Sequence, residues 1–252
     1  MAQVSTVTSQ AGAVIRHDVA MRFLFVGDSM TIGRSGDFTW RYRMWQHLEA
    51  TVGCGGYAIT GPRTELYDTE ANAPLSHTYG DPDFPAPARR HLAGWGEGWL
   101  HMAPVIADTV TVTRADVLLV SLGLIDLGFY TNSEQTAANA RAFVTAARTA
   151  NPRIRLVLLP VIPNVRAESD APFAAECDSF NVLLAKAVAD LDTPSSPVLL
   201  ASHPAGYDIR TDTYDGTHPG PTGEHKLAGA FADAMHQAWG VGGAYAQAVL
   251  AA

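Results

Sequence analysis

Five short apolar runs, separated by segments with helical periodicity, constrain the fold of this chain more than any other feature. The clearest is "DVLLVSLG" (116–123), which is apolar through its centre and ends at a glycine. The other four runs span residues 22–26, 57–60, 154–163 and 197–201. Strands that are apolar on both faces are typical of a parallel sheet covered by helices on both sides. The sequence therefore predicts the α/β class, with five parallel strands in a three-layer α/β/α sandwich.

No internal repeat or linker divides the chain, so we expect a single α/β domain over residues 21–240. Residues 1–20 are expected to form a flexible leader and residues 241–252 a C-terminal tail. Helices are predicted over residues 37–50, 133–150, 180–191 and 221–239, where apolar positions keep helical spacing. The long irregular stretch 61–97 is predicted to be a lid or binding loop, because loops of that length in compact domains are commonly functional.

The composition excludes two classes of partner. With a net charge of −8, the chain lacks the excess of Lys and Arg that phosphate binding requires, so we expect no nucleic acid partner. No apolar run approaches the roughly 20 residues of a membrane span, so no membrane partner is expected. The N-terminus has neither a basic start nor an apolar signal-peptide core, which favours a cytoplasmic location.

The cysteines and most of the histidines give no sign of a disulfide framework or a metal site. Cys54 and Cys177 are expected to be buried apolar residues. The histidines at positions 77, 91 and 203 have no partner at metal-ligand spacing, and the histidine at 225 is predicted to lie on the surface. We therefore expect no metal.

The stretch "FVGDSMTIG" (25–33) places Ser29 directly after the first predicted strand. A helix that begins at this turn would direct backbone N–H groups toward a developing oxyanion. Gly-Asp-Ser is also ordinary turn and N-cap chemistry. This segment alone therefore leaves two interpretations of Ser29, a nucleophile or a capping residue.

A second polar segment, "YDGTHPGPTGEHKLAG", lies between the last predicted strand and the last predicted helix. Asp215 and His218 are three residues apart in it, so the carboxylate can fold back onto one imidazole nitrogen and leave the other free to accept a serine proton. The alternative is a surface turn with a helix cap. In a parallel sheet, this loop and the Ser29 turn lie at the same edge, which favours the catalytic interpretation.

Two of these blocks, "GDSMT" and "DGTHPGPTGEHKLA", resemble those of the SGNH (GDSL-like) hydrolases. The stretches "WRYRMWQHLEATVGCGGYAITGP" and "AGWGEGWLHMAPVI" are similar to the carbohydrate-esterase-like members of that superfamily. The resemblance implies a flavodoxin-like sheet, ester hydrolysis or acyl transfer, and no cofactor. By position it implies that Ser29 is the nucleophile, His218 the general base and Asp215 its orienting acid. It also implies that the Gly94 amide joins the Ser29 amide in an oxyanion hole.

The chain departs from the family pattern at one position of that oxyanion hole. The third family block is Gly-x-Asn-Asp, and the matching stretch here is "SLGLIDLG". Gly123 and Asp126 are in place, but Ile125 stands where the family has the asparagine, and isoleucine has no side-chain donor. Losing one oxyanion donor typically costs about 10²–10³ in turnover. The departure weakens the prediction of an efficient esterase.

Six residues near these blocks are candidates for substrate contact: Asp28, Arg34, Trp95, Trp99, Leu124 and Asp126. The two tryptophans flank the region of the predicted oxyanion glycine. Arg34 would meet an acidic substrate group or else lie solvated at a helix start. For Asp126 a structural hydrogen-bonding role is the alternative.

The sequence is compatible with three functions. The first is a serine-dependent carboxylic-ester hydrolase that acts on a small-molecule ester or acylated metabolite through an acyl-enzyme. The second uses the same triad for acyl transfer, elimination or cyclisation in secondary metabolism. The third is a ligand-binding relative without catalysis, and the complete set of Ser29, Asp215 and His218 argues against it.

Overall fold

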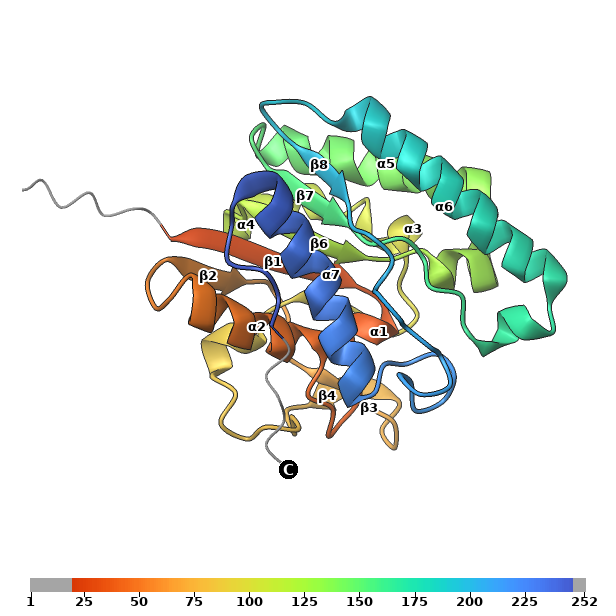
Figure 1. Ribbon diagram of the computed structural model, residues 1–252, viewed down its shortest axis with the longest axis horizontal. Coiled ribbons are helices and arrows are strands. Elements are labelled where there is room, and N and C mark those ends of the chain that lie inside the picture. Colours follow the sequence, from red (N-terminus) through yellow and green to blue (C-terminus); the bar gives the residue numbers. More distant parts are fainter. Residues whose placement is uncertain (1–19, 247–252) are drawn as a thin grey trace, which may run out of the picture.

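Six parallel strands form the central sheet, and five of them coincide with the predicted apolar runs. The computed structural model describes residues 20–246, so nearly all of the predicted leader lies outside the described residues. The strands are β1 (Met21–Gly27), β2 (Tyr57–Thr60), β5 (Leu92–Ala93), β6 (Val117–Ser121), β7 (Arg155–Leu158) and β8 (Val198–Leu200). Their order is β2-β1-β6-β7-β8 (Figure 1). The two-residue strand β5 pairs with the carboxyl end of β1. This flavodoxin-like order confirms the predicted fold class.

Strand β1 places the start of the candidate site at the middle of the sheet. Its residues Phe23–Val26 are fully buried, as their continuous apolar character predicts. The register with β6 aligns Gly27 with Ser121, so both strands end at the same level. The strand order reverses between β1 and β6, and ligands of open α/β sheets bind outside the carboxyl ends of the strands at such a point.

Helices cover both faces of the sheet. Helices α2 (Trp40–Thr51) and α7 (Pro221–Trp239) pack against each other in front of the sheet in Figure 1. Helices α4 (Ile106–Thr113), α5 (Ser133–Ala150) and α6 (Ala171–Leu191) pack in a row on its other side. The short helices are α1 (Ser29–Ile32), α3 (Trp99–Met102), η1 (Ala86–Arg89), η2 (Asp126–Tyr130) and η3 (Val165–Glu168).

Helix α6 begins nine residues before the predicted start at Phe180. The side chain of Asp170 accepts a hydrogen bond from the Phe173 amide at 3.0 Å, and a proline stands in the first turn. Both features stabilise a helix start, because they satisfy or remove amides that have no partner within the helix.

The stretch 61–97, predicted as an irregular lid or binding loop, contains regular structure. It holds the hairpin of β3 (Leu66–Asp68) and β4 (Ala73–Ser76), the helix η1 and the strand β5. The hairpin is hydrogen-bonded to the segment after α1, through Tyr67 N to Gly33 O at 2.9 Å and Ser35 N to Tyr67 O at 2.8 Å. These bonds fix the stretch beside the carboxyl end of β1.

A buried ion pair joins the two helices on the front face. Arg43 of α2 and Glu224 of α7 lie 3.1 Å apart, with side chains only 6% and 3% exposed. The other Glu224 oxygen accepts the Thr39 amide at 2.8 Å. Burial raises the pKa of Glu224, and the charge of Arg43 opposes this effect.

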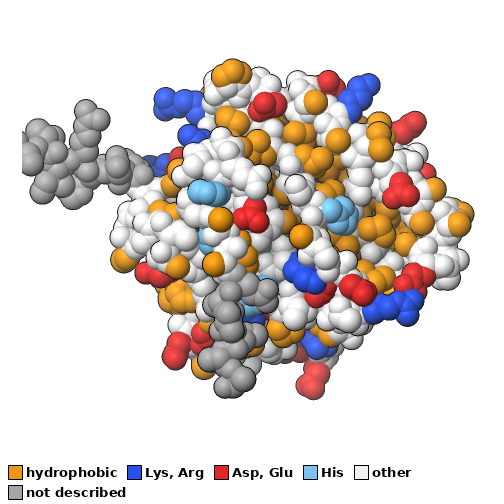
Figure 2. Space-filling model, in the orientation of Figure 1, with side chains coloured by type: hydrophobic (Ala, Val, Ile, Leu, Met, Phe, Trp, Pro, Cys, Tyr) orange, Lys and Arg blue, Asp and Glu red, His pale blue; other side chains and the backbone are white. Residues whose placement is uncertain are grey.

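One face of the molecule shows how its charged side chains are distributed. On the face drawn in Figure 2, Lys and Arg side chains are interspersed with Asp and Glu side chains, with hydrophobic side chains between them. None of the helices within residues 20–246 combines the length and the apolar character needed to cross a lipid bilayer. The prediction for Cys54 is wrong, because this thiol is exposed after the end of α2, whereas Cys177 is buried on α6.

We expect Glu224→Ala to lower the free energy of unfolding by about 3–5 kcal/mol, because it leaves the Arg43 charge buried without a partner. Urea unfolding of both proteins measures the difference. The matched control is Glu168→Ala, which removes an exposed ion pair with Arg210 and should cost less than about 1 kcal/mol. Equal losses for the two variants would contradict the importance of the buried pair.

Candidate active site

Ser29 lies at the turn between β1 and α1, as predicted. It is the first residue of α1, and the side chain of Asp28 caps this helix by accepting the Met30 amide at 2.9 Å. A side chain on Gly27 would place its Cβ 2.9 Å from the Ser121 carbonyl oxygen, closer than real Cβ contacts allow. The glycine therefore lets β1 turn into α1 against the end of β6.

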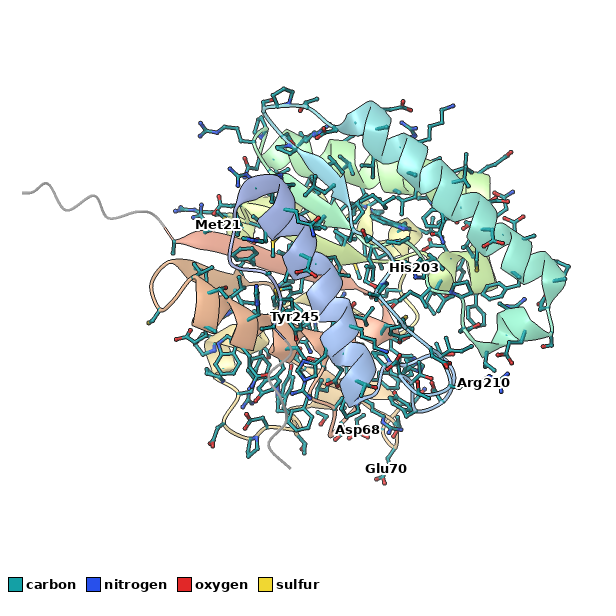
Figure 3. All side chains as sticks on the ribbon, in the orientation of Figure 1. Met21, Asp68, Glu70, His203, Arg210 and Tyr245 are labelled. Atoms are coloured by element: carbon teal, nitrogen blue, oxygen red, sulfur yellow. The ribbon has the colours of Figure 1, made fainter. Side chains whose placement is uncertain are left out.

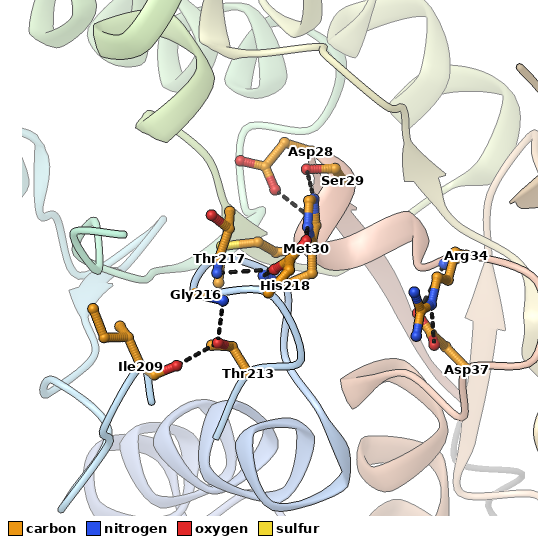
Figure 4. A network of polar contacts seen from close by, with 11 residues as sticks. Asp28, Ser29, Met30, Arg34, Asp37, Ile209, Thr213, Gly216, Thr217 and His218 are labelled. Atoms are coloured by element: carbon orange, nitrogen blue, oxygen red, sulfur yellow. Dashed lines mark hydrogen bonds and ion pairs between the residues drawn. The ribbon is translucent and has the colours of Figure 1, made fainter. Parts of the chain in front are cut away.

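His218 lies against Ser29, although 189 residues separate them in the sequence. His218 Nε2 is 2.9 Å from Ser29 Oγ (Figure 4), and His218 Nδ1 is 2.7 Å from Asp215 Oδ2. A carboxylate only accepts, so Nδ1 carries the proton and Nε2 is left to accept the proton of Ser29. The structure thus brings the three predicted triad residues together.

The loop before α7 is shaped to present His218. Asp215 Oδ1 accepts the amides of Thr217 and His218 at 3.0 and 2.8 Å. Thr213 Oγ1 accepts the Gly216 amide at 2.8 Å and itself donates to the Ile209 carbonyl (Figure 4). Burial acts to raise the pKa of Asp215, but hydrogen bonds from the amide and ring of His218 outweigh it and hold that pKa below its usual value.

The ring of His218 stacks on two aromatic rings. Trp95 lies at 4.6 Å between ring centroids with planes 18° apart, and Tyr214 at 5.7 Å with planes 15° apart. Tyr67 stacks on Trp95 at 4.4 Å, and the guanidinium of Arg34 lies 3.7 Å from the Tyr214 ring centre. The stack therefore joins the β3–β4 hairpin, the loop after β5, the loop before α7 and the segment after α1.

A pocket of about 370 Å³ opens beside Ser29. Its lining residues are Ser29, Trp95, Gly96, Leu124, Ile125, Gly128, Phe129, Tyr130, Asn164, Arg166, Phe173, Thr217 and His218. The predicted Trp95 and Leu124 are among them, and Ile125 faces the same space. A larger hollow of about 620 Å³ between β8 and α7 contains none of the triad residues.

Eight lining residues were not predicted as site residues from the sequence. Three of them are Gly96, Gly128 and Thr217, and the other five are Phe129, Tyr130, Asn164, Arg166 and Phe173. Of these five, Phe129, Tyr130, Asn164 and Arg166 come first in the chain. The first four follow β6 and β7 in the chain, at the carboxyl ends of those strands. Ligand sites of open α/β sheets gather at that edge, so strand position was the available signal. Phe173 lies in the first turn of α6 and gave no such signal.

The structure corrects the prediction of Gly94 as an oxyanion donor. Its amide donates to the Gly27 carbonyl at 3.1 Å and continues the pairing of β5 with β1. The Gly98 amide is also occupied, by His101 Nδ1 at 3.0 Å. Gly96 lines the pocket, and within residues 20–246 neither its amide nor that of Ser29 has a hydrogen-bond acceptor. Both amides are therefore free to donate to a bound group, whereas the side chain of Ile125 has no donor.

Three predicted substrate contacts are wrong because their side chains are buried away from the pocket. Asp28 caps α1, and Trp99 is fully buried, with its ring edge-on to Phe143 at 5.1 Å. Asp126 is also fully buried and accepts the amides of Trp99 and Leu100 at 2.8 and 3.0 Å. Burial raises the pKa of Asp28 to about 7 and raises that of Asp126. Both carboxyls hold backbone amides in place.

Arg34 also lies outside the pocket lining. Its guanidinium is 3.5 Å from Asp37 and covers the Tyr214 ring. Arg34 therefore packs against the loop before α7 through Tyr214, and its contact with a substrate stays a prediction.

His225 was predicted on the surface but is buried. Its Nδ1 is 2.8 Å from the hydroxyl of Tyr245, which Figure 3 labels beside α7. Burial lowers the pKa of His225 to about 4. Within the described part of the chain, no three His, Cys, Asp or Glu side chains are grouped so as to hold a metal ion.

Solved structures of several esterases share this fold. A carbohydrate esterase family 3 protein from Talaromyces cellulolyticus is 24% identical, with a TM-score of 0.69 over 84% of this chain and 94% of its own. The family 3 carbohydrate esterase of Clostridium thermocellum is 18% identical, with a TM-score of 0.68 over 86% and 96%. Axe2, an acetylxylan esterase from Geobacillus stearothermophilus, is 14% identical, with a TM-score of 0.62 over 92% and 99%.

No curated protein matches the sequence significantly. The family model of GDSL-like lipases and acylhydrolases, in contrast, matches residues 25–226, which include the Ser29 turn and the loop that carries His218. This match covers most of the chain and both ends of the triad. The chain therefore belongs to the GDSL-like lipase/acylhydrolase family.

Proposed function

We propose that the protein is a carboxylic-ester hydrolase in which Ser29 forms an acyl-enzyme. The observation that carries this proposal is the continuous hydrogen-bonded chain from Ser29 Oγ through the His218 ring to Asp215, with distances of 2.9 and 2.7 Å. Ser29, at one end of this hydrogen-bonded series, lines a pocket large enough for a small-molecule ester. Membership of an acylhydrolase family supports the same chemistry.

The proposal gives each triad residue a role. Ser29 Oγ attacks the acyl carbon while His218 Nε2 takes its proton, and Asp215 stabilises the imidazolium that forms. The imidazolium then returns the proton to the leaving alkoxide as the ester bond breaks. Water next attacks the acyl-serine, with His218 again as the base, and the acid product leaves a regenerated Ser29 hydroxyl.

The oxyanion of each tetrahedral intermediate faces the amides of Ser29 and Gly96 in this proposal. With Ile125 in the position assigned to the family asparagine, two donors replace three. The loss of one donor is worth about 3–4 kcal/mol of transition-state stabilisation. We therefore expect slow hydrolysis of simple esters.

Acyl transfer is the second candidate function, and Ile125 is the observation that favours it. Its aliphatic side chain lines the pocket beside Ser29, together with Leu124 and Phe173. Apolar walls disfavour water near the acyl-serine. An acceptor alcohol would then take the acyl group by the same steps, with its hydroxyl in the place of water. A protein that only binds a ligand remains the third candidate.

We expect an alkyl fluorophosphonate to label the wild-type protein once, on Ser29, because that hydroxyl is hydrogen-bonded to a basic nitrogen. Intact-protein mass spectrometry followed by peptide mapping measures the adduct. Ser29→Ala and His218→Ala should abolish labelling and ester turnover, while Ser202→Ala, at an exposed serine near β8, should retain both. A ligand-binding protein without catalysis would show no adduct and no difference among these variants.

We further expect Ile125→Asn to raise kcat for p-nitrophenyl esters by about tenfold or more, because it supplies an amide donor to the oxyanion. Ile125→Leu is the matched control, since it repacks the same volume without a donor, and it should leave kcat within about threefold. Steady-state kinetics of purified variants measures both. A loss of activity in Ile125→Asn would instead indicate a pocket built around an apolar side chain for acyl transfer.

A further inference from the structure

The pocket beside Ser29 is apolar well beyond the reacting atoms. Leu124 and Ile125 lie in the segment after β6, and Phe129, Tyr130 and Phe173 also line the pocket. No carboxylate side chain lines it in the part of the chain that the structure describes. Carboxylates and amides are common partners for sugar hydroxyls, and of these two groups the wall offers only Asn164.

Two aromatic side chains at this pocket are exposed to solvent. Phe129 is 75% exposed and Tyr130 is 53% exposed. Both belong to η2, a single π-helical turn closed by the Thr131 amide on the Asp126 carbonyl at 2.8 Å. Single π-helical turns are rare in proteins, and those that occur are often found at functional sites. Adjacent exposed aromatic residues at a pocket provide apolar surface that a ligand can cover.

The positive charge in the pocket is already compensated. Arg166 donates from Nε to Asp170 at 2.8 Å and from Nη1 to the Gly128 carbonyl at 2.9 Å. Its guanidinium lies 4.4 Å from the Phe173 ring centre. Arg166 therefore ties η3 to η2 as part of the wall, and the pocket does not select for an anionic group.

We propose that the substrate carries an apolar acyl chain of roughly four to eight carbons, a size suited to a pocket at the lower end of the small-molecule range. The chain lies along Leu124 and Ile125, next to the acyl carbon on Ser29, and covers Phe129 and Tyr130. This proposal rests on the proposed ester chemistry at Ser29. It separates this pocket from one that accepts only an acetyl group.

The test is kcat/KM for p-nitrophenyl esters from acetate to octanoate, with acetylated xylo-oligosaccharide as the polar comparison. Burial of each methylene should raise kcat/KM by about 3–4-fold up to about six carbons. Phe129→Ala should lower the octanoate-to-acetate ratio at least threefold, and Phe129→Leu should restore most of it. Val182→Ala, at a 70% exposed valine of α6, should leave the ratio unchanged.

A flat or falling series, or faster turnover of the acetylated oligosaccharide, would overturn the acyl-chain proposal. So would a series of alkyl acetates that responds to Phe129→Ala while the acyl series does not, because the wall would then hold the alcohol. Fluorophosphonate labelling of Ser29 is read separately, so a failure of the chain-length proposal remains distinguishable from a failure of the ester chemistry.

The stacking on His218 carries a second, independent inference. We infer that Tyr214 is a positioning residue for the His218 ring, which stacks on both Tyr214 and Trp95. These two stacking contacts fix the ring plane in which Nδ1 meets Asp215 and Nε2 meets Ser29. They also stabilise the imidazolium cation that forms during the reaction, through its attraction to the π faces. The hydroxyl of Tyr214 is buried with no partner among the described residues, so the ring carries this role.

Tyr214→Leu tests this role without altering the pocket lining. We expect kcat to fall by about 2- to 30-fold with KM unchanged, the size of a cation–π contact. The acid limb of the pH profile of kcat/KM should move to lower pH, since the protonated ring loses stabilisation. Tyr214→Phe should match the wild type in both readouts. Equal impairment of the Phe and Leu variants, or an unmoved acid limb in Tyr214→Leu, would overturn the inference.

Discussion

The buried ion pair between Arg43 and Glu224 holds together the two parts of the chain that form the site. Ser29 precedes α2 by eleven residues, and His218 precedes α7 by three. The ion pair and the bond from Thr39 to Glu224 lock α2 against the first turn of α7. A 2.9 Å contact between residues 189 positions apart depends on that docking. A buried pair with additional hydrogen bonds suits this role, because removing either partner leaves a buried charge uncompensated and lowers the free energy of unfolding.

The fold and the triad were predictable because each rests on a local pattern. Continuous apolar runs identify buried parallel strands wherever they occur, and the carboxyl-edge rule places the loops with Ser29 and His218 together. Strand β5 escaped prediction because it has only two residues. Because of its register with β1, the Gly94 amide donates to a carbonyl of the sheet, whereas the Gly96 amide has no acceptor among the described residues. No pattern in "GWGEG" shows which glycine continues a ladder.

The substrate contacts were harder to predict, because proximity to a motif says little about where a side chain points. Asp28 and Asp126 turn inward to satisfy backbone amides that would otherwise be buried without acceptors. Phe129 and Tyr130 reach the pocket through a π-helical turn, which sequence periodicity does not predict. The polar scaffold of the site and its apolar wall thus arise from the same segment after β6. Asp126 in this segment anchors the start of α3, and Phe129 and Tyr130 face the pocket.

The proposed function depends on a covalent acyl-Ser29 intermediate, formed in a pocket with two backbone oxyanion donors. Rapid-quench mass spectrometry during turnover of p-nitrophenyl hexanoate would detect this intermediate. We expect a transient hexanoyl adduct on the peptide that contains Ser29, formed at the rate of the p-nitrophenol burst and lost at the steady-state rate. Turnover with neither a burst nor an adduct on that peptide would contradict it.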